Sequence, residues 1–254
     1  MTVAATTPAR FLEWDSTFFA RRIALVANVS LPVGGVADVL DWCRSERIEC
    51  LYVLTDADDV HTLHALETAG GRLVDLRLTF DLKPAAAPHA AARTVRPHRA
   101  SDVAALRTIA AASHGNSRFY ADGHFPRARC NELYATWIEK SCMGWADQVF
   151  VAEVDEEPAG SLSCHVRAGG RGEIGIVGVA GSAQGHGLGR DLVETALAWF
   201  AERGIERVTV VTQGRNIVAQ RLYQTMGFRT AQVQVWHHLW FDPHQLSGTD
   251  GTRA

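Results

Sequence analysis

The sequence has no long apolar run, only two lysines (Lys83 and Lys140) and no strong excess of either charge. Its hydrophobic stretches all fall short of the roughly 18 to 20 residues that a membrane-spanning helix needs. The N-terminus shows no basic stretch followed by an apolar core, so we expect no signal peptide and a cytoplasmic protein. A formal net charge of -3 gives no electrostatic reason to expect a nucleic-acid partner.

The five cysteines offer no recognisable metal centre. Their number is odd, and they show neither C-x-x-C spacing nor a nearby pair of histidines suited to zinc. We therefore predict no metal and interpret the cysteines as buried or unreactive thiols. The chain is otherwise 47% hydrophobic and 21% charged over 254 residues, which is typical of a globular protein.

The first third of the chain alternates between strand-like and helix-like segments. Segments rich in Val, Ile and Leu predict strands at 22–29, 48–54 and 72–82, and helical apolar spacing predicts helices at 36–47 and 58–69. A stretch of Pro and Ala follows that offers no large apolar side chain to a core. We therefore predict a small α/β domain at 1–83, a linker at 84–94, a second domain at 95–242 and a flexible tail at 243–254.

The second domain mixes helices and strands. Helices are predicted at 100–112, 127–140, 187–203 and 217–226, the second of them beginning beside Pro126. Strands are predicted at 148–154, 159–166, 173–179, 207–212 and 228–240, the first two joined by a hairpin turn at 155–158. A polar and aromatic loop separates the first two helices. The fold class is therefore α/β (α+β).

A glycine-rich loop joins the strand 173–179 to the helix 187–203. Glycines at 185, 187 and 189 let successive N–H groups point outward, and the first turn of a helix leaves four N–H groups without partners. Such a loop is a natural site for a pyrophosphate, although these letters alone also fit a merely flexible turn. The Walker pattern needs a Gly-Lys pair and the dinucleotide fingerprint needs glycine at position 190, which is Arg, so both fail.

The spacing Gln184-x-x-Gly187-x-Gly189 resembles the acetyl-CoA loop of the GNAT superfamily of N-acetyltransferases. The segment 216–228 resembles the superfamily's second signature, an Asn followed by Ala, Leu-Tyr and Gly-Phe. At about 100° per residue, Asn216, Gln220 and Tyr223 share one helix face. The resemblance covers about residues 95–240, and it implies a GNAT fold with a central mixed sheet flanked by helices and acetyl-CoA as the acetyl donor.

The same resemblance implies roles for individual residues. Tyr223 would be the acid, because a phenol with a reference pKa of about 10 can share its proton with a leaving thiol; it can also be an aromatic packed between helix and sheet. A main-chain N–H of the strand 176–179 would stabilise the oxyanion. The residues implied to bind acetyl-CoA are Ile176, Val177, Gly178, Val179, Gln184, Gly185, His186, Gly187, Leu188, Gly189, Arg190, Asn216, Gln220 and Tyr223.

Two further motifs, at 11–19 and 117–127, resemble those of bacterial two-domain enzymes of the dTDP-fucosamine acetyltransferase type. These enzymes acetylate the 4-amino group of a nucleotide-linked amino-dideoxy sugar, and a small α/β domain precedes their GNAT domain. The resemblance implies a nucleotide-linked amino sugar as the small-molecule partner and leaves a homodimer open. Trp14, Phe18 and Phe19 of the first motif can also be core anchors.

The segment 117–127 overlies the acceptor site in this superfamily. Its aromatic residues can stack on a sugar or a nucleobase, and its arginine can fork onto a phosphate. The residues implied to bind the acceptor are Arg118, Phe119, Tyr120, His124 and Glu173. These residues can also simply pin a long loop. For the general base the candidates are His114, His124, His165, Glu173 or a water molecule.

Two other functions stay open. One is acetylation of another amine, such as a peptide N-terminus, an aminoglycoside or a natural-product intermediate. The other is a non-catalytic module that binds acyl-CoA. The intact loop at 184–189 with Asn216 and Tyr223 argues against the module, and the extra N-terminal domain argues against a minimal peptide acetyltransferase.

Overall fold

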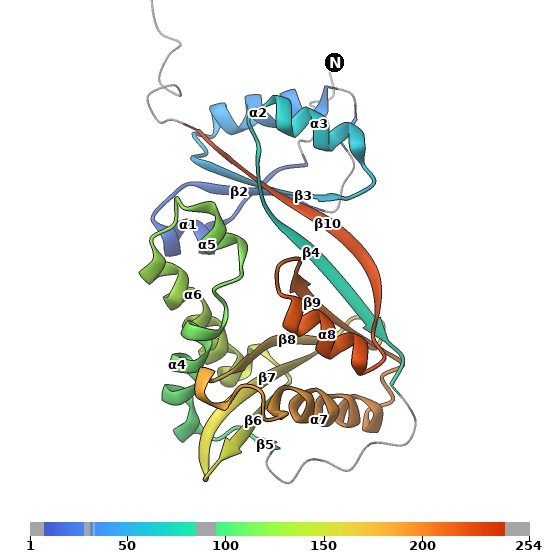
Figure 1. The fold of residues 1–254 in the computed structure, drawn as a ribbon. Helices are drawn as coiled ribbons and strands as arrows, with labels where there is room; N and C mark the ends of the chain where they lie inside the picture. Colours follow the sequence, from blue (N-terminus) through green and yellow to red (C-terminus); the bar gives the residue numbers. More distant parts are fainter. Residues whose placement is uncertain (1–7, 28–30, 33, 85–94, 242–254) are drawn as a thin grey trace, which may run out of the picture. The chain divides into compact units, whose positions relative to one another are not determined.

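The computed structural model describes residues 8–27, 31–32, 34–84 and 95–241, and Figure 1 shows their helices and strands. The chain divides into two compact units. The first consists of Met1–Arg77 together with Val233–Ala254, and the second of Leu78–Gln232. The structure confirms the predicted mixture of helices and strands, and each unit has its own apolar core.

The division falls within two strands, β4 (Arg72–Leu82) and β10 (Arg229–Trp240). The end of the last predicted strand therefore groups with the N-terminal residues rather than with the second domain. Apart from its first residue, the predicted linker 84–94 lies outside the described residues, as does the whole predicted tail 243–254. The domain limits given by the sequence accordingly stay a prediction.

The first unit is a sheet with helices packed on it. Its strands lie in the order β1 (Arg10–Phe11), β2 (Ile23–Ala27), β3 (Cys50–Asp56), β10 and β4. β2 and β3 are parallel and are connected through α2 (Gly35–Ser45), whereas β10 is antiparallel to β3. The remaining helices described there are α1 (Glu13–Phe19) and α3 (Val60–Thr68).

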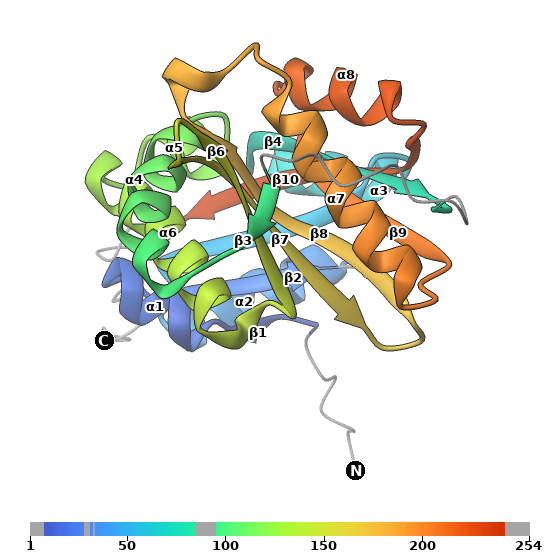
Figure 2. The same ribbon diagram turned by 90° about the horizontal axis from the view of Figure 1, so that it is seen from below.

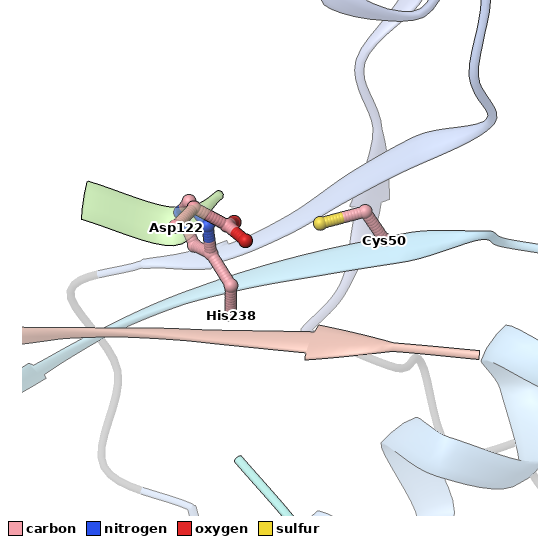
Figure 3. Close-up of side chains that lie close together, drawn as sticks. All are labelled: Cys50, Asp122 and His238. Atoms are coloured by element: carbon pink, nitrogen blue, oxygen red, sulfur yellow. The ribbon is translucent and has the colours of Figure 1, made fainter. Parts of the chain in front are cut away.

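The core of the first unit lies between β2 and β3 and the helices α2 and α3. Every residue of β3 except the last is buried, which is typical of a strand covered on both faces. His238 of β10 and Cys50 of β3 are buried on neighbouring strands (Figure 3), and the His238 ring stacks on Tyr52 with centroids 4.4 Å apart. Asp122, also labelled in Figure 3, belongs to the second unit.

The second unit contains the remaining strands and helices. Its strands lie in the order β4, β9 (Arg207–Gln213), β8 (Arg171–Val179), β7 (Glu157–Arg167), β6 (Gln148–Val154) and β5 (Val95–Pro97). The pairs from β5 to β8 are antiparallel, and β8 and β9 are parallel. Its α-helices are α4 (Val103–Ser113), α5 (Arg118–Asp122), α6 (Arg127–Lys140), α7 (Leu188–Glu202) and α8 (Ile217–Thr225).

Helices cover both faces of the strands of the second unit, as Figure 2 shows, with α7 on one face and α4 and α6 on the other. The sequence of β7 explains the two layers, because alternate residues of a strand point to opposite faces. Leu162 and Cys164 join the apolar cluster that includes Leu192 and Phe200 of α7. Ser163, which lies between them, is polar and points to the opposite face of the sheet.

One predicted loop was wrong. The segment between the first two helices of the second domain contains α5, which begins after Ser117 and ends at Gly123 with φ 83°. Phe119 is 1% exposed and packs edge-on against Phe125 and Trp137, at 5.6 and 6.4 Å between centroids. A helix of five residues is too short to show helical periodicity, so tertiary packing decided its conformation.

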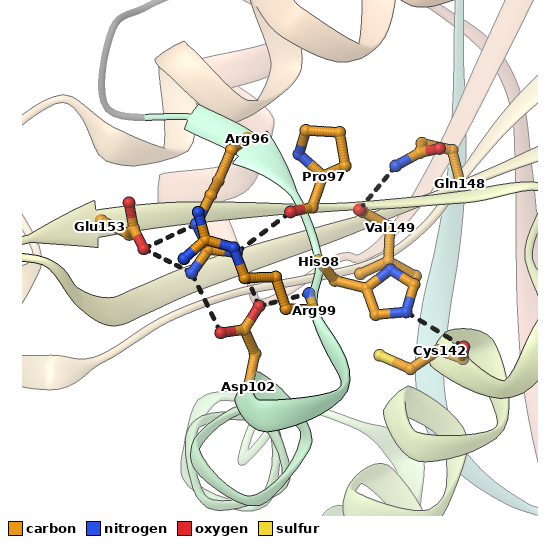
Figure 4. Close-up of polar contacts among 9 residues, drawn as sticks. All are labelled: Arg96, Pro97, His98, Arg99, Asp102, Cys142, Gln148, Val149 and Glu153. Atoms are coloured by element: carbon orange, nitrogen blue, oxygen red, sulfur yellow. Dashed lines mark hydrogen bonds and ion pairs between the residues drawn. The ribbon is translucent and has the colours of Figure 1, made fainter.

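An arginine on β5 fixes the start of α4 (Figure 4). The Arg96 guanidinium donates to both carboxylate oxygens of Asp102, at 2.7 and 3.0 Å, and to Glu153 Oε1 at 2.7 Å. Asp102 also accepts a hydrogen bond of 2.6 Å from the Arg99 N–H. The bonds from Arg96 hold the pKa of the Asp102 carboxyl below its usual range, while burial acts in the opposite direction. This network orders the 3-10 turn Ala100–Asp102 that leads into α4.

Candidate active site

The parallel strands β8 and β9 separate part of the way along their length. Their pairing ends where Ile174 lies opposite Val210, yet β8 continues to Val179 and β9 to Gln213. Beyond this point, no strand within the described residues pairs with the side of β8 that would face β9. An extended ligand that carries amide groups could take the place of the missing strand.

A bulge in β8 lies at the start of this opening. Leu162 of β7 faces Val177, and Cys164 faces Ile174, so Ser163 faces both Gly175 and Ile176. The Ile176 N–H donates a hydrogen bond of 2.9 Å to Ser163 Oγ. This N–H of the predicted cofactor strand is therefore already engaged within the sheet.

Only glycine fits at position 175. A Cβ there would lie 2.5 Å from Ser163 Oγ and 2.7 Å from His165 Nε2, closer than any real Cβ contact. His165 is 4% exposed, and burial lowers the pKa of its imidazole. Its Nε2 lies 3.3 Å from Ser163 Oγ. Ser163 Oγ accepts the hydrogen bond from the Ile176 N–H, so the Ser163 hydroxyl proton is available to His165 Nε2. The three residues thus form a short chain of hydrogen bonds.

Beyond the bulge, the main-chain groups of successive β8 residues point alternately towards β7 and towards the opening. The Ala180 N–H bonds to the Ala159 carbonyl of β7 at 2.8 Å, and the Ile176 N–H also points towards β7. Main-chain groups of Val177 and Val179 therefore point to the side from which β9 has separated. The Val179 carbonyl accepts from Gln184 Nε2 at 3.2 Å, which ties the opening to the glycine-rich loop.

The glycine-rich loop forms the N-terminus of α7. Gly185 and Gly187 have left-handed φ values of 82° and 86°, and Gly187 is the N-cap residue. Its carbonyl accepts the N–H groups of Arg190 and Asp191 at 2.9 and 3.1 Å. The preceding N–H groups and the helix dipole make this end of the helix suited to an anion.

The other residues predicted in the loop have mixed surroundings. His186 is exposed, whereas Leu188 is 6% exposed and belongs to the apolar core. The Arg190 side chain pairs with Glu194 one turn further along, at 2.8 Å. Leu188 can therefore offer a ligand only its main chain.

The first turn of α7 packs closely against α8. A Cβ on Gly189 would lie 3.4 Å from Leu222 Cδ2, so a small residue lets the two helices approach. Leu222 precedes Tyr223, and this contact ties the glycine-rich loop to the helix that carries the predicted acid. The structure thus links the two sequence signatures through one packing contact.

Asn216 and Gln220 have structural partners at the start of α8. Asn216 is the N-cap residue, and its Oδ1 accepts a 3.2 Å hydrogen bond from the Ala219 N–H. Gln220 Nε2 donates to the carbonyls of Gln213 and Gly214 at 3.1 and 2.8 Å. Both side chains therefore fix the turn from β9 into α8, a role that the prediction of cofactor contacts did not include.

Tyr223 is an aromatic packed within the core, with a side chain only 3% exposed. Its ring lies 6.0 Å from the Phe80 ring and 5.8 Å from the Phe228 ring. Burial raises the pKa of its phenol above the usual value. The group therefore stays protonated at neutral pH, as an acid must before the leaving group departs.

The predicted acceptor residues lie on or near α5. The Arg118 guanidinium stacks on Phe119 at 4.2 Å, and Phe119 itself is buried. The Tyr120 hydroxyl donates to Asn131 Oδ1 at 2.7 Å. The buried Phe119 ring thus anchors the segment, as the alternative interpretation of this loop proposed, while Arg118 and Tyr120 extend from it.

The other two predicted acceptor residues each have a polar partner in the structure. His124 Nδ1 lies 2.6 Å from Asp122 Oδ1. Glu173 of β8 accepts two hydrogen bonds from the Arg167 guanidinium, at 2.9 and 3.0 Å. Glu173 would have to exchange its partner before it could bind a ligand through these oxygens, whereas the bond of His124 occupies only Nδ1.

Comparison with known proteins identifies the domain that contains this site. Residues 109–228 match the Acetyltransferase (GNAT) family. The chain carries a GNAT acetyltransferase domain. The match includes the opening in β8, the glycine-rich loop and all of α8, so the GNAT fold expected from the sequence is confirmed and the chain is an acetyltransferase.

Two relatives match the GNAT domain and the residues before it. The dTDP-fucosamine acetyltransferase of Escherichia coli O6:H1 is 27% identical over 228 residues, which are 89% of this chain and 95% of the relative. The spore coat polysaccharide biosynthesis protein SpsD of Bacillus subtilis is 24% identical over 89% of this chain and 81% of its own length. A solved GCN5-related N-acetyltransferase from Sphaerobacter thermophilus has the same fold, with a TM-score of 0.65 and 17% identity over 91% of this chain and 76% of that one.

No disulfide joins the cysteines within the described residues, and most of them are buried. Burial raises the pKa of Cys43 to about 12 and that of Cys130 and Cys142 to about 11, and it raises the pKa of Cys164 further. These four thiols are therefore protonated at neutral pH and poor nucleophiles. None of the helices within the described residues has the length and apolar character needed to cross a bilayer.

Proposed function

We propose that this GNAT enzyme transfers the acetyl group of acetyl-CoA to the amine of a nucleotide-linked amino-deoxy sugar. The observation that carries the acetyl-CoA part is the opening between β8 and β9, which lies beside the N-terminus of α7. The opening can bind amide groups, and the N-terminus of α7 can bind an anion. Acetyl-CoA carries both groups in one molecule.

The residues present fit this donor. Main-chain N–H groups around Gly185 and Gly187 would hold the pyrophosphate, because both glycines leave the backbone open to close approach. Val177 and Val179 would bind the amides of the pantetheine arm in the manner of a β-strand. Gly178 keeps this strand close to α4, since a Cβ there would lie 3.3 Å from Ser113 Oγ.

Direct transfer from donor to amine needs no enzyme nucleophile. The four thiols whose pKa values burial raises are protonated at neutral pH, which supports direct attack by the acceptor amine. Tyr223 would give its proton to the departing thiolate, and its raised pKa keeps that proton in place until then. A main-chain N–H of Val177 or Val179 would stabilise the oxyanion.

Two observations support a nucleotide-linked sugar as the acceptor. The first is the similarity to dTDP-fucosamine acetyltransferase over nearly the full length of both chains. The second is the pairing of Arg118 and Tyr120 on α5, which offers a guanidinium for a phosphate and a ring for a sugar or a base. Arg127 also lies over the Tyr120 ring at 5.5 Å, which adds positive charge to this segment.

Release of the CoA thiol from acetyl-CoA tests the proposal across a panel of amines. The panel contains dTDP-linked amino-deoxy sugars, the same sugars without the nucleotide, peptides with free N-termini and aminoglycosides. We expect the highest kcat/KM for the nucleotide-linked sugars. An equal or higher value for a peptide or an aminoglycoside contradicts the acceptor, and binding of acetyl-CoA without thiol release on any amine indicates a non-catalytic module.

A further inference from the structure

The end of α4 contacts β8 beside the opening through Ser113, and the next residue is a histidine. Ser113, the last residue of α4, places its Oγ 3.3 Å from the Val179 carbonyl. A Cβ on Gly178 would lie at the same distance from Ser113 Oγ. His114 follows directly as the C-cap residue, so its imidazole belongs to the segment that borders the predicted acetyl site.

The contacts of His114 define which nitrogen can accept a proton. Its Nδ1 lies 2.9 Å from the Ala110 carbonyl, an acceptor only, so Nδ1 carries the hydrogen and Nε2 carries the lone pair in the neutral ring. The ring stacks on Tyr134 of α6, with centroids 4.2 Å apart and planes 4° from parallel. This pair of contacts holds the imidazole in one tautomer and one orientation.

The surroundings of His114 favour the neutral form. Burial lowers the pKa of the imidazole, and the hydrogen bond to Ala110 opposes this shift. Tyr134 is the titratable residue that stacks on it from α6, and the residues of β8 beside Ser113 are Gly178 and Val179, which do not titrate. A neutral imidazole at pH 7 is the form that a base requires.

The other candidate bases are engaged elsewhere. His165 is buried with Nε2 close to Ser163 Oγ, at 3.3 Å. His124 pairs with Asp122, and Glu173 forms a double hydrogen bond with Arg167. Glu173 would have to give up its bonds to Arg167. His124, like His114, is bonded through Nδ1, but its bond is to Asp122 of its own segment, whereas the segment of His114 contacts β8 through Ser113.

We propose that His114 is the general base of the acetyl transfer, an assignment that rests on the proposed acetylation of an amine. His114 Nε2 takes one proton from the acceptor ammonium, which leaves a neutral amine. The amine nitrogen forms a bond to the acetyl carbon, the bond between this carbon and sulfur breaks, and the thiolate takes the proton of Tyr223. The proton on His114 then passes to water, and the second amine proton restores the Tyr223 phenol by way of solvent.

The variant His114→Phe tests this role, because it keeps a ring to stack on Tyr134 and removes the proton acceptor. We expect kcat on the preferred amine to fall by about 10²-fold to 10⁴-fold, the usual contribution of a general base. The affinity for acetyl-CoA, measured by calorimetry, should stay unchanged. His64→Phe is the matched control, since His64 is exposed on α3 of the first unit, and its kcat should equal that of the unmodified chain.

Rescue separates a chemical role from a structural one. His114→Ala leaves space at the end of α4, and added imidazole should restore part of the lost kcat in proportion to the unprotonated imidazole present. Equal kcat for the unmodified chain and His114→Phe contradicts the base assignment alone. Loss of acetyl-CoA affinity in His114→Phe, or no rescue of His114→Ala at any pH, also overturns it. No thiol release by the unmodified chain on any amine contradicts the proposed function, and the base assignment with it.

Discussion

The Ile176 N–H donates a 2.9 Å hydrogen bond to Ser163 Oγ across the bulge where β8 begins to leave β9. Ser163 is fully buried, so Ser163→Ala would leave this N–H without a partner. A buried unsatisfied donor costs about 1–3 kcal/mol, and we expect the free energy of unfolding in urea to fall by that amount. We also expect a lower kcat, because the bulge shapes the strand that we propose to bind acetyl-CoA.

Ser161→Ala is the control for this prediction. Ser161 lies two residues away on the same face of β7, and it is also buried. Its Oγ has no hydrogen-bond partner within the described part of the chain, so its removal should leave stability unchanged or slightly higher. Equal destabilisation by the two variants would show that the bond to Ile176 contributes nothing of its own.

Gly187 has a left-handed φ of 86° at the N-cap of α7. Gly187→Ala should cost about 1–2 kcal/mol of stability, because a Cβ is strained in this conformation. The variant should also raise the KM for acetyl-CoA about tenfold, which corresponds to roughly 1.4 kcal/mol of binding. Steady-state kinetics with varied acetyl-CoA measures this change.

Gly204→Ala separates backbone strain from loss of binding. Gly204 also has a left-handed φ, 67°, and a Cβ there would meet nothing within 4 Å, as at Gly187. It follows α7 at the opposite end from the glycine-rich loop. We expect a similar loss of stability and an unchanged KM for acetyl-CoA. A similar rise in KM for both variants would mean that the loop glycine has no special role.

Local sequence patterns were sufficient for much of the fold. The strands 72–82 and 148–154 and the helix 127–140 have the predicted bounds in the structure. In each case apolar periodicity and a neighbouring turn or proline mark the element within its own residues. The pairing of β10 with β3 had no such signal, because Gln234 and its partner Asp56 are far apart in the sequence.

The site was predictable only where a motif is contiguous. Spacing alone predicts acetyl-CoA contacts for the loop 184–189 and Asn216, and these stay predictions. The N-cap role of Asn216 could have been predicted from its place before a helix. Ser163 and Gly175 were missed because their meaning depends on a bulge in the register between β7 and β8. The residue types alone, a serine and a glycine within strands, do not predict this register.

Tyr223→Phe should lower kcat by about 10²-fold to 10⁴-fold and change the affinity for acetyl-CoA far less. The ring would still pack against Phe80 and Phe228, so only the proton donor is lost. Because burial raises the pKa of the phenol, the acid stays protonated as pH rises, and its ionisation should cause no loss of kcat below about pH 10. Tyr52→Phe, in the first unit, is the control, and equal kcat for the two variants would contradict the acid role.

The Asp102 carboxylate provides a test through acid stability. Its hydrogen bonds from Arg96 lower its pKa in the folded chain, so its contribution is complete above the unfolded pKa of about 3.9 and is lost as pH falls through the folded value. Asp102→Asn should cost about 1.5–3 kcal/mol at pH 7, the range for hydrogen bonds to a charged group, measured by urea unfolding. The difference from the unmodified chain should shrink below about pH 4. Asp41→Asn is the control, because it breaks an exposed ion pair with Arg44 on α2, and it should change stability by less than about 1 kcal/mol. If the loss of stability in Asp102→Asn were the same at every pH, the charge of Asp102 would not be what stabilises this turn.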